Sequence, residues 1–208
     1  MSDITGKIGS YTVTLTPPIG RGQFGTVHKA IQDGTQTIMA AKQIIIGEQG
    51  RINTELRRMA ESEIKIMEDL QSHSNIVKVH EHFIQDNVCW LFVEFCDLGN
   101  LSSYLRDNQS VELFEKIKIM HQSASAVAFM HNQNPPIIHR DIKLDNIMMK
   151  RERGDDVVKL TDFGLSKLLP GRPQSLTNVM QRYVEVIECV HYGNVVIDLI
   201  SNRIYRIQ

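Results

Sequence analysis

A stretch of nine residues near the middle of the chain constrains its fold more than any other feature. It runs from Ile138 to Asn146 and reads Ile-His-Arg-Asp-Ile-Lys-Leu-Asp-Asn. Within it, Asp141 offers a carboxylate, Lys143 a cation and Asn146 an amide oxygen. A carboxylate can accept a proton, an ammonium can meet a phosphate, and hard oxygen ligands suit Mg²⁺. This order of polar types predicts a loop that turns a base towards one side and a metal ligand towards the other.

A second acidic motif, Asp162-Phe163-Gly164, follows the nonapeptide. A single aspartate of this kind is usually a solvated loop residue, but chance rarely supplies all the polar types of the nonapeptide in order. The nonapeptide resembles the catalytic loop of protein kinases, HRDxKxxN, and the second motif resembles their DFG segment at the expected distance. The resemblance implies an α+β, bilobal protein-kinase-like fold with a five-stranded N-lobe, a helix αC and an incomplete helical C-lobe.

A glycine-rich segment, Gly20-Arg21-Gly22-Gln23-Phe24-Gly25-Thr26-Val27, lies between two predicted strands, 11–20 and 26–31. Glycines let backbone N–H groups approach a phosphate without a Cβ in the way. A lone GxGxxG is a weak signal, and its best-known use is a dinucleotide-binding unit in which a helix follows. A strand follows here, which favours a lid between two strands that resembles the kinase glycine loop. An ordinary hairpin turn is the alternative interpretation.

A third strand is predicted over 37–46, and Lys42 is the only charged residue in it. A lysine inside a strand usually points to solvent. Its spacing after the glycine-rich segment favours a functional interpretation, in which it resembles the VAIK lysine of kinases, with Met39 in place of Val.

Residues 51–70 have apolar residues at helical spacing, including Leu56 and Met59, and are predicted to form helix αC. In the kinase resemblance an acid of this helix pairs with Lys42. Three candidates are present, namely Glu55, Glu61 and Glu63. Glu63 is chosen because Glu63-Ile64, with the apolar residues that follow, fits the kinase pattern.

Further elements follow the order of a kinase. Strands are predicted near 76–84 and 88–95, and the segment that ends at Cys96 resembles the hinge, where backbone groups of Glu94 and Cys96 would bind the adenine edge. A short helix is predicted to begin at residues 99–101 and a long one to span 111–131. Two short strands, 147–149 and 157–160, are expected around a charged turn.

The resemblance implies a role for each site residue. Asp141 would accept the proton of the substrate hydroxyl, Lys143 would stabilise charge on the transferred phosphoryl group, and Asn146 and Asp162 would bind Mg²⁺. The residues expected to bind ATP are Ile19, Gly20, Arg21, Gly22, Gln23, Phe24, Gly25, Thr26, Val27, Ala40, Lys42, Glu63, Glu94 and Cys96.

The expected kinase domain covers 11–208 and is partial. It comprises an N-lobe (11–97), the start of a C-lobe (98–169) and a divergent tail (170–208). In the tail, Tyr183-Val184-Glu185 lacks the proline of the kinase Ala-Pro-Glu motif, and β-structure between 183 and 200 is an alternative to a helix opening at Asp198. The expectation is therefore a C-terminally truncated or divergent domain, whose uncovered core would be either a partner interface or an aggregation liability.

Composition excludes several other classes. The formal net charge is −1, and no basic stripe indicates nucleic-acid binding. No apolar run approaches the ~18 residues that span a bilayer, so no membrane association is expected. Three cysteines without metal spacing fit a reducing compartment, and a cytoplasmic location is expected.

The expected function is that of a serine/threonine protein kinase that transfers the ATP γ-phosphate to a protein Ser or Thr hydroxyl, because Asp-x-Lys in the catalytic loop is the serine/threonine form. ATP and Mg²⁺ are the implied cofactors, and a protein substrate and a regulatory protein are the implied partners. The alternatives are a catalytically weak or inactive nucleotide-binding regulatory protein and a product that does not fold stably.

Overall fold

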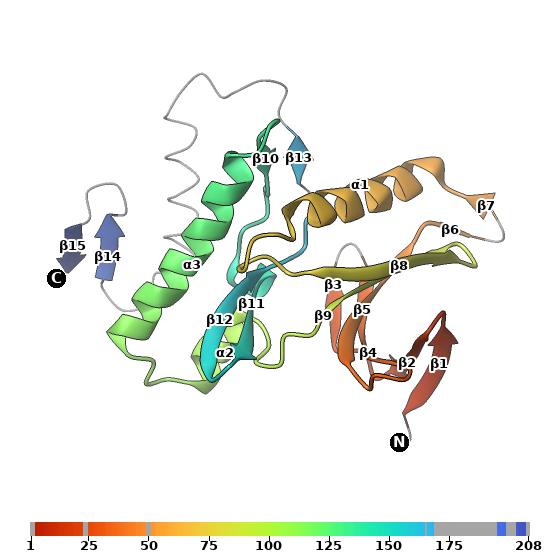
Figure 1. The fold of residues 1–208 in the computed structure, drawn as a ribbon, viewed down its shortest axis with the longest axis horizontal. Coiled ribbons are helices and arrows are strands. Elements are labelled where there is room, and N and C mark those ends of the chain that lie inside the picture. The colour runs from red at the N-terminus through yellow and green to blue at the C-terminus, as the bar shows by residue number, and fades with distance from the viewer. Residues whose placement is uncertain are drawn as a thin grey trace. The chain divides into compact units, whose positions relative to one another are not determined.

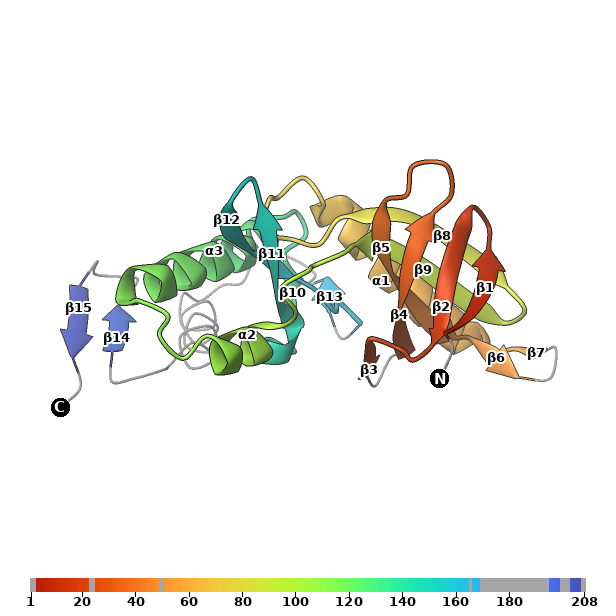
Figure 2. The same cartoon turned by 90° about the horizontal axis from the view of Figure 1, so that it is seen from below.

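The computed structural model describes residues 3–22, 25–48, 51–164, 166–168, 195–198 and 203–206. They fall into two compact units, shown in Figures 1 and 2. Unit 1 takes residues 1–72 and 77–96, and unit 2 takes residues 73–76 and 97–208. We describe each unit by itself.

Unit 1 contains a seven-stranded antiparallel sheet with the order β1-β2-β4-β5-β9-β8, and β3 pairs with β4. The strands are β1 (Ile4–Ile8), β2 (Tyr11–Thr16), β3 (Gly20–Gly22), β4 (Gly25–Gln32), β5 (Ile38–Ile45), β8 (Val79–Gln85) and β9 (Val88–Glu94). All five predicted strands are present. The sheet exceeds the expected five because β1 adds an edge strand and because the glycine-rich segment contributes a short strand of its own, β3.

Local sequence explains the β8–β9 hairpin. The two residues between its strands, Asp86 and Asn87, have φ values of 51° and 62°. A two-residue hairpin turn of type I′ needs positive φ at both central residues, and Asp and Asn tolerate it better than most residues.

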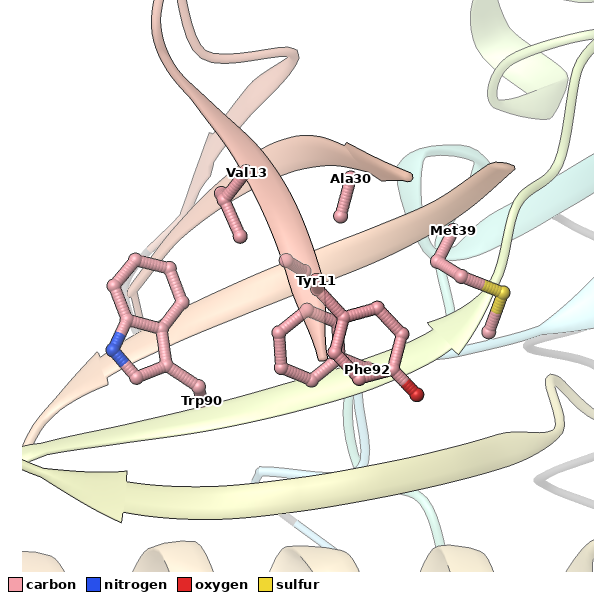
Figure 3. Packing of buried hydrophobic residues seen from close by; sticks show 7 residues of the cluster. Tyr11, Val13, Ala30, Met39, Trp90 and Phe92 are labelled. Atoms are coloured by element: carbon pink, nitrogen blue, oxygen red, sulfur yellow. The ribbon is translucent and has the colours of Figure 1, made fainter. Parts of the chain in front are cut away.

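The core of unit 1 shows that its sheet is curled. Tyr11 on β2 stacks on Phe92 on β9, with ring centroids 3.8 Å apart and planes inclined by 16° (Figure 3). Strands β4 and β5 separate β2 from β9 in the sheet order, so in a flat sheet the two would lie about 14 Å apart. Strand twist and coiling bring them together around a cluster of buried residues, which are Tyr11, Val13, Ala30, Met39, Ala41, Trp90 and Phe92.

Helix α1 (Thr54–Leu70) contacts β8 and β9, and it lies along β8 in Figure 1. It begins later than the predicted 51–70 because Asn53 is its N-cap, with Oδ1 accepting from the backbone N–H groups of Glu55 (3.0 Å) and Leu56 (3.1 Å). The preceding short strands, β6 (Gly47–Glu48) and β7 (Arg51–Ile52), pair with each other.

Unit 2 contains helices α2 (Leu101–Asp107) and α3 (Leu113–His131), close to the predicted positions. The predicted hairpin is present as β11 (Ile147–Glu152) and β12 (Asp155–Leu160), and a 3₁₀ turn, η1 (Leu144–Asn146), precedes it. Strands β10 (Ile137–Ile138) and β13 (Lys167–Leu168) pair with each other, and α3 contacts β10 and β12.

Asn75 links α3 to β12. Its buried amide donates to Gln122 Oε1 on α3 and to the Val158 carbonyl on β12, both at 3.0 Å.

Part of the tail is described. Strands β14 (Val195–Asp198) and β15 (Arg203–Arg206) form an antiparallel pair. Asp198 therefore ends a strand, which agrees with the β-structure alternative at residues 195–198; the rest of 183–200 lies outside the described residues. Tyr183, Val184 and Glu185 lie outside the described residues. None of the helices in the described part of the chain is long and apolar enough to cross a membrane.

Candidate active site

The glycine-rich segment of unit 1 is the hairpin formed by β3 and β4. Gly20 pairs with Val27 and Gly22 pairs with Gly25 across it. Gly25 has φ of +143°, and a Cβ there would overlap the Gln43 carbonyl oxygen on β5. Only glycine fits this position without strain. The two residues at the tip, Gln23 and Phe24, lie outside the described residues.

Three predicted ATP-binding residues lie on one face of the sheet. Val27 on β4 pairs directly with Lys42 on β5, so both side chains point to the same side, and Ala40 joins them because side chains of a strand alternate. Met39 and Ala41 point to the other face, into the Tyr11–Phe92 core. The sheet thus separates an aromatic core from the face that carries Lys42.

Lys42 is paired with Glu63 on α1. The Lys42 Nζ–Glu63 Oε1 distance is 2.6 Å, and the two side chains are 14% and 4% exposed. Glu61 instead pairs with Arg57 one turn earlier on the same helix, with a side chain that is 51% exposed. Of the three candidate acids, Glu63 is the one that the helix buries beside the lysine.

The remaining predicted residues of unit 1 lie along the strands and at the end of β9. Ile19 is 51% exposed, and Arg21 and Thr26 pair with each other across the β3–β4 hairpin. The backbone N–H of Glu94 donates to the Lys78 carbonyl at 3.0 Å. Cys96 is buried.

The catalytic-loop residues of unit 2 converge on Asp141. Its Oδ2 accepts from Lys143 Nζ at 2.8 Å and from Asn146 Nδ2 at 2.9 Å, and Nδ2 also donates to the Asp141 carbonyl at 2.8 Å. Burial by itself would raise the pKa of Asp141, but the hydrogen bonds from Lys143 and Asn146 outweigh it and hold this pKa below its ordinary value. The hydrogen bond to Asp141 correspondingly raises the pKa of Lys143. Asp141 is therefore an ionised carboxylate near neutral pH.

His139 joins the loop to the acidic motif. Its ring is 1% exposed, lies 5.0 Å from the Phe163 ring between centroids, and has Nε2 2.9 Å from the Thr161 carbonyl. The backbone N–H of Asp141 donates to Nδ1 at 3.3 Å. Burial lowers the pKa of His139, so the neutral ring donates through Nε2 and accepts through Nδ1.

The backbone around these residues is also unusual, since Arg140 and Asp162 have φ values of 71° and 65°. Non-glycine residues rarely adopt positive φ values, and those that do cluster at functional sites.

Asn146 and Asp162 are the predicted metal ligands. Asn146 is buried, and its Nδ2 is directed at Asp141, so its amide oxygen is the atom that could meet a cation. Within the described residues no group of three or more His, Cys, Asp or Glu side chains could hold a metal. Mg²⁺ is usually bound in proteins by one or two side-chain oxygens together with substrate phosphates, and the amide oxygen of Asn146 and the carboxylate of Asp162 are oxygens of this kind.

Comparison with known proteins identifies this arrangement. The family model of the protein kinase domain matches residues 13–200. The chain belongs to the protein kinase family. The kinase is 34% identical over 155 residues to the Aurora kinase of Schizosaccharomyces pombe, an alignment that covers 74% of this chain and 41% of the relative. It is 30% identical over 165 residues to the serine/threonine-protein kinase Nek8 of Danio rerio, covering 79% and 23%.

A probable serine/threonine-protein kinase of Dictyostelium discoideum is 33% identical over 166 residues, covering 76% of this kinase and 14% of the relative. The chain spans less than half the length of these curated relatives. The resemblance to a bilobal α+β kinase fold and to the serine/threonine class of kinases is confirmed, and the family match extends beyond residue 168, where the motif resemblance decayed.

Sequence reasoning missed one contact that holds the loop in place. The hydrogen bond between His139 Nε2 and the Thr161 carbonyl, which joins the loop to the segment before Asp162, was not predicted. A signal was present, since Thr161 directly precedes the acidic motif. The hydrogen bonds of Asn75 to Gln122 and to the Val158 carbonyl were likewise not predicted.

Proposed function

We propose that this kinase transfers the γ-phosphate of ATP to a serine or threonine hydroxyl of a protein. The observation that carries the proposal is the environment of Asp141, which is ionised and positioned by Lys143 and Asn146. A general base must be deprotonated and held in place before it can accept a hydroxyl proton.

In this proposal each unit contributes its own groups. Asp141 accepts the hydroxyl proton, Lys143 stabilises charge on the moving phosphoryl group, and Asn146 and Asp162 hold Mg²⁺. Bound Mg²⁺ would neutralise the phosphate oxygens. The hairpin of β3 and β4, with Lys42 held by Glu63, binds the phosphates of ATP, and the end of β9 binds the adenine. The assignment of residues 11–97 to an N-lobe and 98–169 to a C-lobe, and a cytoplasmic location, belong to the same proposal.

A phosphoryl-transfer assay with degenerate peptides tests this proposal, using serine, threonine or tyrosine as the only acceptor in each pool. We expect transfer to the serine and threonine pools. Asp141→Asn should lower kcat by about 10²–10⁴-fold, the usual contribution of a general base. The control Asp107→Asn, at an exposed position on α2, should leave kcat unchanged.

Mg-ATP binding, measured by thermal shift, separates catalysis from a binding-only role. At about 100 times its dissociation constant the nucleotide should stabilise both wild type and Asp141→Asn by about 2.7 kcal/mol. Binding without transfer in the wild type would replace the proposal by the nucleotide-binding regulatory alternative. A folded chain with neither binding nor transfer would refute both.

A further inference from the structure

The strand that leads towards the glycine-rich hairpin is interrupted before it reaches the hairpin. The ladder between β2 and β4 ends where Thr14 pairs with Lys29. The ladder between β3 and β4 begins where Gly20 pairs with Val27. A single residue of β4, His28, lies between these two pairs, opposite the longer segment that joins β2 to β3. The base of the hairpin therefore depends on contacts other than a continuous ladder.

The side chain of His28 supplies such contacts. His28 is 4% exposed, its Nδ1 lies 3.2 Å from the Thr14 carbonyl oxygen on β2, and its Nε2 lies 3.3 Å from Gln43 Oε1 on β5. A carbonyl only accepts hydrogen bonds, so Nδ1 carries a proton and donates to Thr14. The ring also lies against Trp90, one of the core residues labelled in Figure 3, with ring centroids 5.9 Å apart. One side chain of β4 thus bridges the strands on either side of it.

The contact with Gln43 is important because of its position on β5. Gln43 directly follows Lys42, whose side chain is paired with Glu63. The backbone carbonyl of Gln43 is also the group that a Cβ at Gly25 would overlap, so the first residue of β4 rests directly on it. His28 and Gly25 therefore hold both ends of one short stretch of β4 against β5, beside Lys42.

Ordinary core packing is the alternative explanation of a buried histidine. An apolar side chain would fill the same space beside Trp90, and the neighbouring core positions on this face, Ala30 and Ala41, are apolar. Burial of a polar ring is costly unless its nitrogens find partners. Packing alone does not explain why both ring nitrogens reach polar groups, one on each neighbouring strand. Directional contacts of this kind fix the strands relative to one another.

We propose that His28 is a positioning residue for ATP, which holds the β3–β4 hairpin against β2 and β5 at the spacing that the nucleotide phosphates need. The inference rests on the proposed function, in which this hairpin and Lys42 bind the phosphates. The His28 side chain faces the core, because side chains of a strand alternate and Val27 points to the opposite face, with Lys42. His28 therefore acts through the backbone of β4 and not by contact with the nucleotide.

Calorimetric titration of the full chain with Mg-ATP and with adenosine tests this proposal. Adenosine lacks the phosphates, so it reports only on the adenine end of the site. We expect His28→Leu to weaken Mg-ATP binding about tenfold, the effect of losing one well-placed hydrogen bond, and to leave adenosine binding unchanged. In the peptide assay the KM for ATP should rise by the same factor with kcat nearly unchanged, because the hairpin holds the phosphates equally in the ground state and the transition state.

Further variants separate positioning from packing. His28→Asn keeps a donor at the place of Nδ1, so it should recover most of the Mg-ATP affinity that His28→Leu loses. Gln43→Met removes the other contact and keeps the length of the side chain, and it should lower the affinity for Mg-ATP but not for adenosine. It carries the same test if His28→Leu does not fold, which circular dichroism would report. The control His82→Leu, the same change at a β8 side chain that is 44% exposed, should alter neither affinity.

Three results would overturn the proposal. The first is equal Mg-ATP affinity in wild type, His28→Leu and Gln43→Met. The second is a parallel loss of Mg-ATP and adenosine affinity, which would indicate a general structural role. The third is a folded wild type that binds no Mg-ATP. Failure of the proposed function alone would look different, because the variants would still show the selective loss of Mg-ATP affinity while the wild type transferred phosphate to none of the peptides.

Discussion

Replacement of Glu63 by glutamine gives the most direct test of how unit 1 is held together. The change keeps the shape of the side chain but removes its charge, which leaves the Lys42 ammonium, 14% exposed, without its carboxylate at 2.6 Å. Removal of one member of a buried ion pair costs about 3–5 kcal/mol. Because glutamine still offers an acceptor and Lys42 has further contacts, we expect the lower end of this range.

Glu61→Gln is the matched control. It is the same chemical change on the same helix, but the Glu61 side chain is 51% exposed in its pair with Arg57. Exposed pairs contribute less than about 1 kcal/mol. Urea unfolding of the purified chain, followed by circular dichroism, should therefore separate the two variants by about 2 kcal/mol or more, a large part of the ~5–15 kcal/mol that stabilises a domain.

The double variant Lys42→Met/Glu63→Leu separates stability from nucleotide binding. Apolar replacement of a whole buried pair is often neutral, so most of the lost stability should return, while Mg-ATP should no longer shift the melting temperature. If Glu61→Gln and Glu63→Gln destabilise equally, the assignment of Glu63 as the buried partner of Lys42 is wrong.

Three further predictions follow from the sites. Gly25→Ala should destabilise the chain by about 1–3 kcal/mol in urea unfolding, because the alanine Cβ would overlap the Gln43 carbonyl. The control Gly22→Ala, whose Cβ would meet no atom within 4 Å, should cost less than about 1 kcal/mol. Equal costs would refute the overlap at Gly25. Burial lowers the pKa of His139 in the folded chain, so the His139 ring binds a proton more readily in the unfolded chain, and the free energy of unfolding should fall as pH drops through the ordinary value of 6.5. His139→Tyr should flatten this fall by up to about 1.4 kcal/mol per pH unit. An unchanged slope would contradict the buried neutral ring. Burial raises the pKa of Asp141, but hydrogen bonds from Lys143 and Asn146 lower it by more. Lys143→Met should therefore move the acidic limb of the pH–rate profile to higher pH. A limb that stays in place would show that Lys143 does not set this pKa.

The sequence predicted local structure well where local rules apply. The five predicted strands of unit 1 and helices α1 and α3 lie close to where the residue pattern placed them, and α2 begins where the kinase resemblance placed it. The exact start of α1 follows from the Asn53 cap. Strand β1 was missed because Gly6 interrupts it and because, at the edge of the sheet, its residues are exposed or only half-buried and give no apolar alternation. Leu56 and Met59 were expected in the apolar stripe of α1 but are 42% and 43% exposed. Periodicity marks a face of a helix and does not say how far its neighbours cover that face.

By itself, the sequence predicted the candidate site of this protein, because the order of His139, Asp141, Lys143, Asn146 and Asp162 is carried by residue type and spacing. Tertiary structure alone decided which groups meet. The residue pattern favours Glu63 among the three acids, and the fold pairs it with Lys42 because Glu63 turns inward with Ile64 and Met67. The fold also curled the sheet until Tyr11 reached Phe92, and it placed the Thr161 carbonyl on His139. These contacts join residues 20 or more positions apart, where position in space depends on every intervening turn and is not encoded in any local pattern.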